Sequence, residues 1–244
     1  KLFAEGRDRE VPHEPLMPVY TAWDLGRTDD TAIWWYQVVA GEIRILEGYA
    51  SSGGSPSEYA SEILGRQVQI DLVDGEVVCK LGPIREELAY RRNYRYGKHF
   101  LPHDARAKTL AAHGKSIIEQ LGVALKLDMM AIVPDIGVEQ GIQAARSMFH
   151  RVYIDKVKCA PGLKALRKYR RELKQDGVSF SPLPKHDWTS HYADAFRMLA
   201  VAWQHETKVE EKPTEAEIFK RLNKPEERTL EQMYAEIPRK VARI

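Results

Sequence analysis

The sequence predicts an α/β fold in which helices flank a mixed sheet. Three runs rich in apolar, aromatic and β-branched residues come first, at residues 19–23, 31–40 and 43–50, with tight turns between them. Such a succession is typical of an antiparallel meander of three strands. From residue 57 onward helical and strand patterns alternate, which adds parallel strands to the same sheet. The 244 residues are enough to form one sizeable core.

Local signals define the later elements. A helix is expected to begin at Ser57, since Tyr59, Ile63 and Leu64 fall on one face of it. Two runs, 68–72 and 77–80, flank Asp74 and Gly75, which is a strong hairpin signal. Further helices are expected at residues 83–95, 116–121, 138–150, 161–173 and 191–204, and further strands at 98–102, 129–133 and 152–154.

Three regions are expected along the chain. Residues 1–18 are polar, contain three prolines and are typical of an incoming linker. Residues 19–204 form the folded domain. Residues 205–244 form a charged segment with two short amphipathic pieces, at 218–222 and 230–237. That segment could fold on a partner, or it is a solvated tail or a short helical appendix packed on the domain.

Composition excludes several classes of protein. Hydrophobic residues make up 43% of the chain and charged residues 30%, with a net charge of +2, as is ordinary for a globular domain. No apolar run reaches the roughly 20 residues of a membrane helix, and no signal-peptide layout is present. Cys79 and Cys159 lack zinc-binding spacing. The sequence of residues 114–116, GKS, resembles the end of a phosphate-binding loop, but Thr109 stands where that loop needs its first glycine.

Three aspartates stand out as candidate catalytic residues. Asp24 and Asp104 each follow an expected strand, and carboxyl ends of strands are where ligand sites gather in open sheets. Asp194 lies one turn into the last helix, between Ala193 and Ala195. Clustered carboxylates repel one another unless a cation neutralises them, and hard cations such as Mg²⁺ or Mn²⁺ prefer oxygen ligands. The pattern therefore predicts a divalent-metal site.

The segments around these aspartates resemble the ribonuclease H-like nuclease domain of tailed-bacteriophage large terminases. The resemblance rests on WDLG at 23–26, DDTA at 29–32, LPHDA at 101–105, CAPGLKAL at 159–166 and SHYADAFR at 190–197. It implies that Asp24, Asp104 and Asp194 bind two Mg²⁺ or Mn²⁺ ions and hydrolyse phosphodiester bonds of double-stranded DNA. It further implies an ATPase domain ahead of residue 1, the portal and the small terminase subunit as partners, and a place in the host cytoplasm, without a membrane.

Other residues are second-rank candidates for the same site. His191 lies one turn before Asp194 and could orient a water or contact phosphate, or could be an ordinary residue at a helix start. Asp30 and Asp187 are nearby carboxylates, and Asp187 could instead cap the last helix.

Two basic clusters are candidates for contact with DNA phosphates, or are solvated helix faces. The candidate DNA-binding residues are Arg91, Arg92, Arg95, Lys98, Lys164, Arg167, Lys168 and Arg171.

The sequence leaves three alternatives open. The sequence DLGRT at residues 24–28 also resembles the first phosphate loop of actin-like and sugar-kinase ATPases, although no second such loop is evident. Another ribonuclease H-like enzyme, such as a junction resolvase or an integrase, would use the same carboxylate chemistry on branched or end-joined DNA. A non-catalytic binding module could also keep the fold.

Overall fold

The computed structural model describes residues 2, 4–26, 30–108, 113–174 and 179–209, with side chains up to residue 204. The chain divides into two compact units, Lys1–His205 and Glu206–Ile244, and the fold below is that of the first. Nearly all of the charged segment expected at 205–244 therefore lies outside the described residues.

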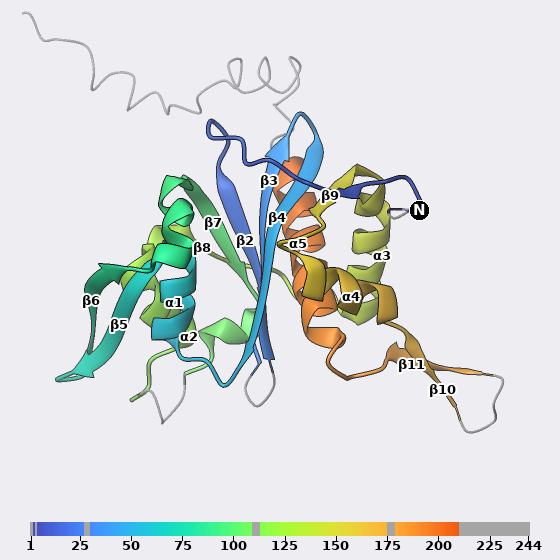
Figure 1. The fold of residues 1–244 in the computed structure, drawn as a ribbon. Helices are drawn as coiled ribbons and strands as arrows, with labels where there is room; N and C mark the ends of the chain where they lie inside the picture. Colours follow the sequence, from blue (N-terminus) through green and yellow to red (C-terminus); the bar gives the residue numbers. More distant parts are fainter. Residues whose placement is uncertain (1, 3, 27–29, 109–112, 175–178, 210–244) are drawn as a thin grey trace, which may run out of the picture. The chain divides into compact units, whose positions relative to one another are not determined.

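A seven-stranded mixed sheet is the centre of the first unit, in the order β1-β9-β4-β3-β2-β7-β8 (Figure 1). Its middle is the expected meander, in which β2, β3 and β4 are antiparallel neighbours. Strands β7 and β8 extend the sheet in parallel beyond β2, and β9 and β1 extend it in parallel beyond β4. The strands are β1 (Asp8–Arg9), β2 (Val19–Asp24), β3 (Asp30–Val39), β4 (Glu42–Ser52), β7 (Tyr96–Leu101), β8 (Met130–Ile132) and β9 (Val152–Asp155). The expected mixed sheet is confirmed.

Helices cover both faces of the sheet (Figure 1). One layer holds α1 (Pro56–Leu64), α2 (Ile117–Leu125) and the hairpin of β5 (Arg66–Val73) and β6 (Glu76–Ile84). The other layer holds α3 (Val138–Met148), α4 (Ala160–Lys168) and α5 (Ser190–Val209). Capping boxes begin the two short helices of the first layer, with Ser55 and Glu58 at α1 and Ser116 and Glu119 at α2. Each satisfies amide groups that the first helical turn leaves without partners.

Strand β3 is buried on both faces and separates two cores. Ala32, Trp34 and Tyr36 belong to the core beneath α3, α4 and α5. The alternating residues Ile33 and Trp35 belong to the core beneath α1 and α2. A strand sends successive side chains to opposite faces, so a continuous apolar run is what a central strand requires.

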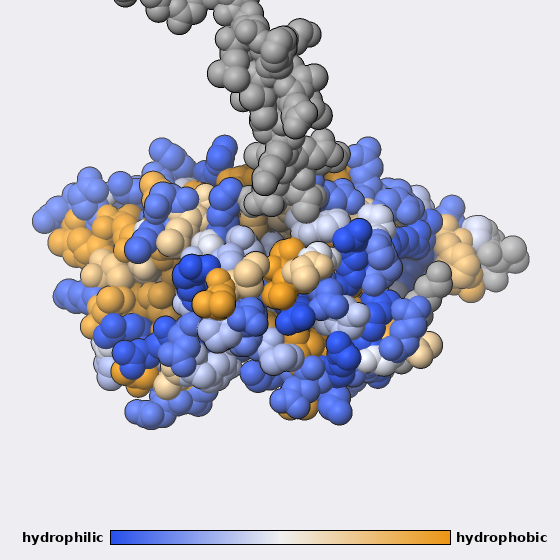
Figure 2. Space-filling view, turned by 90° about the horizontal axis from the view of Figure 1, so that it is seen from above, coloured by the Kyte–Doolittle hydropathy of each residue, from blue (hydrophilic) through white to orange (hydrophobic). Residues whose placement is uncertain are grey.

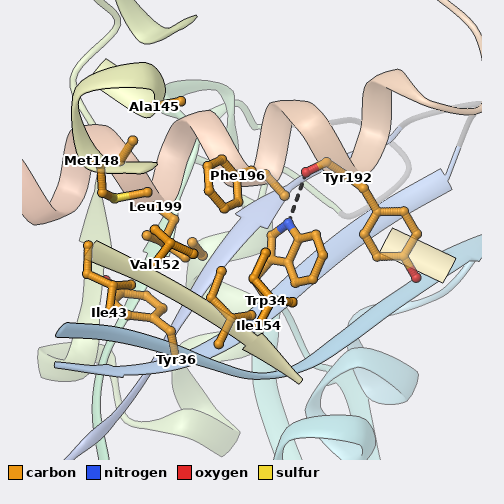
Figure 3. Close-up of a cluster of buried hydrophobic side chains, with 14 of the residues drawn as sticks. Trp34, Tyr36, Ile43, Ala145, Met148, Val152, Ile154, Tyr192, Phe196 and Leu199 are labelled. Atoms are coloured by element: carbon orange, nitrogen blue, oxygen red, sulfur yellow. Dashed lines mark hydrogen bonds between the residues drawn. The ribbon is translucent and has the colours of Figure 1, made fainter. Parts of the chain in front are cut away.

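Trp34 joins helix α5 to the sheet (Figure 3). Its indole Nε1 donates a hydrogen bond of 2.9 Å to the carbonyl oxygen of Tyr192, and its ring packs against the rings of Tyr192 and Phe196. Gly162 on α4 makes room for the indole, because a Cβ there would overlap the six-membered ring of Trp34. One tryptophan therefore fixes the start of α5 against both the sheet and α4.

Two hairpin turns use left-handed backbone. Asp74 and Gly75 both have positive φ between β5 and β6, as the hairpin signal predicted. Ala40 and Gly41 do the same between β3 and β4. Two consecutive positive φ values match the twist of the flanking strands.

Two expected helices are only partly correct. Residues 83–84 continue strand β6, and the rest of the segment 83–95 forms the 3-10 helix η1 (Glu86–Asn93). Helix α4 ends at Lys168, because Tyr169 adopts extended backbone. The chain then forms β10 (Arg171–Leu173), which pairs with β11 (Phe180–Pro184) in a hairpin that the sequence did not reveal.

The segment expected as a linker, residues 1–18, contributes to the fold. Strand β1 pairs with β9 at the sheet edge, and Asp155 accepts a hydrogen bond of 3.0 Å from the Val11 amide. Leu2 and Val11 are buried. Part of this segment is thus an edge strand rather than a free connection.

The surface seen from above is mostly hydrophilic, with a broad hydrophobic area on the left and smaller hydrophobic patches near the middle and at the right (Figure 2). The exposed apolar side chains include Val73 and Leu81 on the β5–β6 hairpin and Phe180 and Leu183 on β11. No helix in the described part of the chain is both long and apolar enough to cross a bilayer.

Candidate active site

Asp24 is the last residue of β2, at the carboxyl end of a central strand. It pairs with Ala32 of β3, and its side chain is partly buried. Strand β7 runs parallel to β2, with Phe100 opposite Ala22. The carboxyl ends of both strands therefore meet at the same edge of the sheet, where open α/β sheets place their ligand sites.

Asp104 lies at that same end, just beyond β7. It is on the short 3-10 helix η2 (His103–Arg106), which Pro102 precedes. The buried side chain of Ala105 holds this turn against the core beneath α1 and α2, while the Asp104 side chain is exposed. The fold thus places the second candidate aspartate at the same end of the sheet as Asp24.

Asp194 comes to this end on the second turn of α5. Its Oδ1 accepts a hydrogen bond of 2.9 Å from Arg197 Nε and lies 2.8 Å from Arg197 Nη2 in an ion pair. The Tyr169 hydroxyl, just after α4, also donates to Asp194 and lies within the electrostatic reach of Asp24. Burial, together with the Asp194 carboxylate, raises the pKa of Tyr169 to about 12. Tyr169 therefore stays protonated at neutral pH and remains a donor.

His191 brings α5 into contact with the end of β2. Its Nδ1 lies 3.9 Å from Asp24 Oδ2, with the imidazole largely buried. The His186 ring lies 5.8 Å from the His191 ring. Asp24, His191 and Asp194 are therefore neighbours in space, although His191 and Asp194 come 167 and 170 positions after Asp24 along the chain.

The three aspartates share one end of the sheet without forming a closed ligand group. Among the residues that the structure describes, no three His, Cys, Asp or Glu side chains converge closely enough to hold a metal ion. Asp194 has Arg197 as its counter-ion instead. The chemistry of the donors suits a hard cation, since all three aspartates offer carboxylate oxygens.

Comparison with known proteins gives matches at the level of structure. No protein-family model and no curated protein sequence matches the chain. The nuclease domain of the large terminase from bacteriophage SPP1, solved with bound Mn, aligns with a TM-score of 0.50 at 11% identity, over 78% of this chain and 86% of that one. The large terminase of a thermophilic bacteriophage gives a TM-score of 0.52 at 11% identity, over 78% of this chain and 41% of that one.

The chain has the fold of a large terminase nuclease domain. This confirms the ribonuclease H-like fold and the resemblance predicted from the sequence. The chain spans less than half of the large terminase from the thermophilic bacteriophage that it matches. The fold of this chain thus corresponds to one part of that longer protein.

Within the terminase nuclease fold, the second-rank carboxylates have local partners. Asp187 Oδ1 accepts hydrogen bonds from the Thr189 amide at 2.9 Å and the Thr189 hydroxyl at 2.6 Å, and these bonds lower the pKa of Asp187. It orders the turn that enters α5, as a capping residue does. Asp30 begins β3 and accepts a hydrogen bond from the Ser52 hydroxyl.

Arg91 is not part of an exposed basic surface, contrary to the sequence interpretation. Its guanidinium is buried and pairs with Glu47 at 2.7 Å and Glu62 at 3.0 Å. Its place in η1 puts it on the turn facing the sheet, where two carboxylates balance its charge. Arg92, Arg95 and Lys98 from the same cluster are exposed.

The second basic cluster consists of Lys164, Arg167, Lys168 and Arg171, and all four side chains are exposed. Arg167 pairs with Asp8 at 3.1 Å, and Arg171 pairs with Glu139 at 2.5 Å. Lys164 and Lys168 lie one helical turn apart on α4, beside the Trp188 ring.

Sequence reasoning missed two residues that contact Asp194. Arg197 lies three positions after Asp194 on α5, a spacing at which opposite charges meet on a helix, so a signal was available. Tyr169 carried no signal, because its contact depends on where α4 ends and the chain turns.

Proposed function

We propose that this chain is a metal-dependent endonuclease that hydrolyses double-stranded concatemeric DNA during viral genome packaging. The supporting observation is that Asp24 and Asp194 lie together at the carboxyl end of the central strands, in the fold of large terminase nuclease domains. One such domain was solved with bound Mn. In the complete motor, the portal and the small terminase subunit would be partners, in the host cytoplasm.

Asp24, Asp104 and Asp194 would hold two Mg²⁺ or Mn²⁺ ions. When bound, such a pair activates a water and stabilises both the attacking and the leaving oxygen of the phosphodiester. Asp104 sits on a 3-10 turn just beyond β7, with its side chain exposed to solvent. Carboxylates that share a site repel one another, so bound cations would favour a closer arrangement of the three aspartates.

The neighbours of the aspartates would prepare the site for this chemistry. Arg197 and Tyr169 restrict the rotation of the Asp194 carboxylate by hydrogen bonding to it. Outer partners of this kind orient metal-binding carboxylates. His191, beside Asp24, is within reach of a water or a phosphate oxygen at the strand end.

The experiment is cleavage of a supercoiled plasmid with Mn²⁺ or Mg²⁺. We expect Asp24→Asn, Asp104→Asn and Asp194→Asn each to reduce cleavage to the level seen in EDTA, with unchanged circular dichroism. Asp128→Asn is the matched control, since Asp128 is exposed on a 3-10 turn (Leu127–Met129) and should leave cleavage intact. Full cleavage by all three aspartate variants would overturn the assignment of the site residues. Absence of cleavage by the unmodified chain with either metal would overturn the proposed nuclease function.

A further inference from the structure

A cavity of about 400 Å³ lies between strand β1 and helix α4. Four cationic side chains line it, together with Ala160, Leu163 and one carboxylate, that of Asp8. The cations are Lys156, Lys164, Arg167 and Lys168. We call this cavity the α4 pocket. Its lining attracts an anion, because cations outnumber the carboxylate four to one.

Three of the cations of the α4 pocket are held in place by other side chains. Arg167 pairs with Asp8 at 3.1 Å. The Nζ atoms of Lys164 and Lys168 lie 5.8 and 5.9 Å from the centroid of the Trp188 ring. An aromatic face attracts a cation at this distance. The two ammonium groups are thereby positioned one helical turn apart, with less rotamer freedom to lose on binding.

Short stretches of chain connect the α4 pocket to the candidate active site. Lys168 immediately precedes Tyr169, which donates to Asp194. Trp188 lies two residues before α5, whose first turns carry His191 and Asp194. A polyanion that lies along α4 would therefore reach Asp194 and Asp24 beyond the C-terminal end of α4.

We propose that the α4 pocket binds backbone phosphates of duplex DNA on the path to the catalytic aspartates. This rests on the proposed nuclease function and adds the position of one stretch of the substrate. Lysine ammonium groups are compact charges and bind phosphate without reading bases. The contact would therefore support cleavage with little sequence preference. The Arg167–Asp8 pair limits the affinity, because Asp8 repels the phosphate that the four cations attract.

The test is binding of a fluorescent duplex to the full chain, followed by anisotropy in EDTA over a range of salt concentrations. Binding in EDTA separates this contact from the metal site. We expect Lys164→Ala with Lys168→Ala to weaken binding about tenfold or more near 0.1 M salt, and to reduce the slope of log affinity against log salt by about 2. Asp8→Asn should instead tighten binding. Lys80→Ala with Arg146→Ala removes equal charge from exposed positions on β6 and α3 and should change binding less than twofold.

The outcomes distinguish this proposal from the nuclease assignment. In Mn²⁺ at saturating DNA, the Lys164 and Lys168 variant should keep the kcat of cleavage and raise KM, whereas Asp194→Asn should lose kcat. Unchanged affinity and salt slope in the lysine variant would overturn the DNA contact while leaving the nuclease assignment standing. Weaker DNA binding by the Asp8→Asn variant would also count against the DNA contact at the α4 pocket.

Discussion

At the scale of single residues, Arg91 serves stability rather than binding. Its guanidinium bridges Glu47 of β4 and Glu62 of α1, and stacks 4.5 Å from the centroid of the Trp35 ring. The hydroxyls of Tyr90 and Tyr94 also donate to Glu47, at 2.7 and 2.6 Å. These contacts fasten η1 to the sheet. A buried cation of this kind is strongly coupled to its carboxylates, because each charge depends on the others for neutralisation.

Arg91→Ala should therefore lower the free energy of unfolding by about 3–5 kcal/mol, since it leaves Glu47 buried without its cation. The measurement is urea denaturation followed by circular dichroism. Arg92→Ala is the matched control, because its exposed neighbouring side chain should contribute within about 0.5 kcal/mol. An Arg91→Ala protein that is as stable as the parent but binds DNA more weakly would instead support Arg91 as a DNA-contacting residue.

His99 makes the stability of the domain sensitive to acid. The imidazole is buried on β7, and its Nδ1 lies 2.8 Å from the Thr21 hydroxyl. Burial lowers the pKa of His99 to about 4. In the unfolded chain the same group takes up a proton near pH 6.5. Between these values the unfolded state binds more protons, so the free energy of unfolding falls as the pH is lowered through this interval.

Lowering the pH from 7 to 4.5 should therefore cost the domain up to about 3 kcal/mol through His99 alone. The measurement is the difference in unfolding free energy between pH 7 and pH 5, compared for the unmodified chain and His99→Gln. The variant should show a smaller difference. His150→Gln, at an exposed position after α3, should leave the difference as it is. An equal difference in all three proteins would contradict the assignment to His99.

At the scale of elements, the contact among α4, α5 and β3 positions the candidate site. Trp34, Gly162 and Tyr192 meet at one point, two residues before Asp194 on α5. The Trp34 indole is fully buried, so it has no room to move away from a larger side chain at position 162. The orientation of α5, and with it that of Asp194, depends on this fit.

Gly162→Ala should destabilise the domain by about 1–3 kcal/mol, the range for an overpacked core, although alanine favours a helix more than glycine does. The loss of stability would be measured as a lower melting temperature in thermal unfolding. Lys164→Ala in the same helix replaces an exposed side chain and should leave the melting temperature nearly unchanged. A Gly162→Ala protein as stable as the parent would show that the indole can shift.

The sequence predicts elements well where local chemistry decides them, and less well where tertiary contacts do. The meander, the Asp74–Gly75 hairpin and the helix around Asp194 all follow from local patterns, and the structure contains them. Helix α4 ended earlier than its basic, helix-forming sequence indicated, because Tyr169 turns away toward Asp194. Arg91 was misassigned for a related reason, since burial of a basic residue depends on carboxylates far along the chain.

At the scale of the whole molecule, the candidate site exists only in the folded chain. Asp24 lies on β2 and Asp194 on α5. The two residues therefore come together only when the sheet has formed and α5 packs against it. The sequence could place each aspartate at a strand end or on a helix. It could not give the distances among them, or the partners of Asp194.

Mn²⁺ should raise the melting temperature of the domain, because a ligand that binds only the folded state stabilises it. Asp24→Asn and Asp194→Asn should abolish the rise. In EDTA, Asp24→Asn should melt at or above the parent temperature, since one of two negative charges near Tyr169 is removed. Asp194→Asn should not gain stability in EDTA, because Arg197 loses its ion pair. Differential scanning fluorimetry would measure both effects, and an undiminished Mn²⁺ shift in both variants would count against the site.

The placement of the tryptophans gives the domain a built-in optical reporter. Trp23, Trp34 and Trp35 are fully enclosed, whereas the Trp188 side chain is about half exposed, beside Lys164 and Lys168. Emission from the enclosed indoles should be blue-shifted and shielded from iodide, while emission from Trp188 should be red-shifted and readily quenched. Replacing Trp188 with phenylalanine would isolate its share of the spectrum. In the unmodified chain, a molecule that binds along α4 should change the emission of Trp188, so binding could be followed without an attached dye.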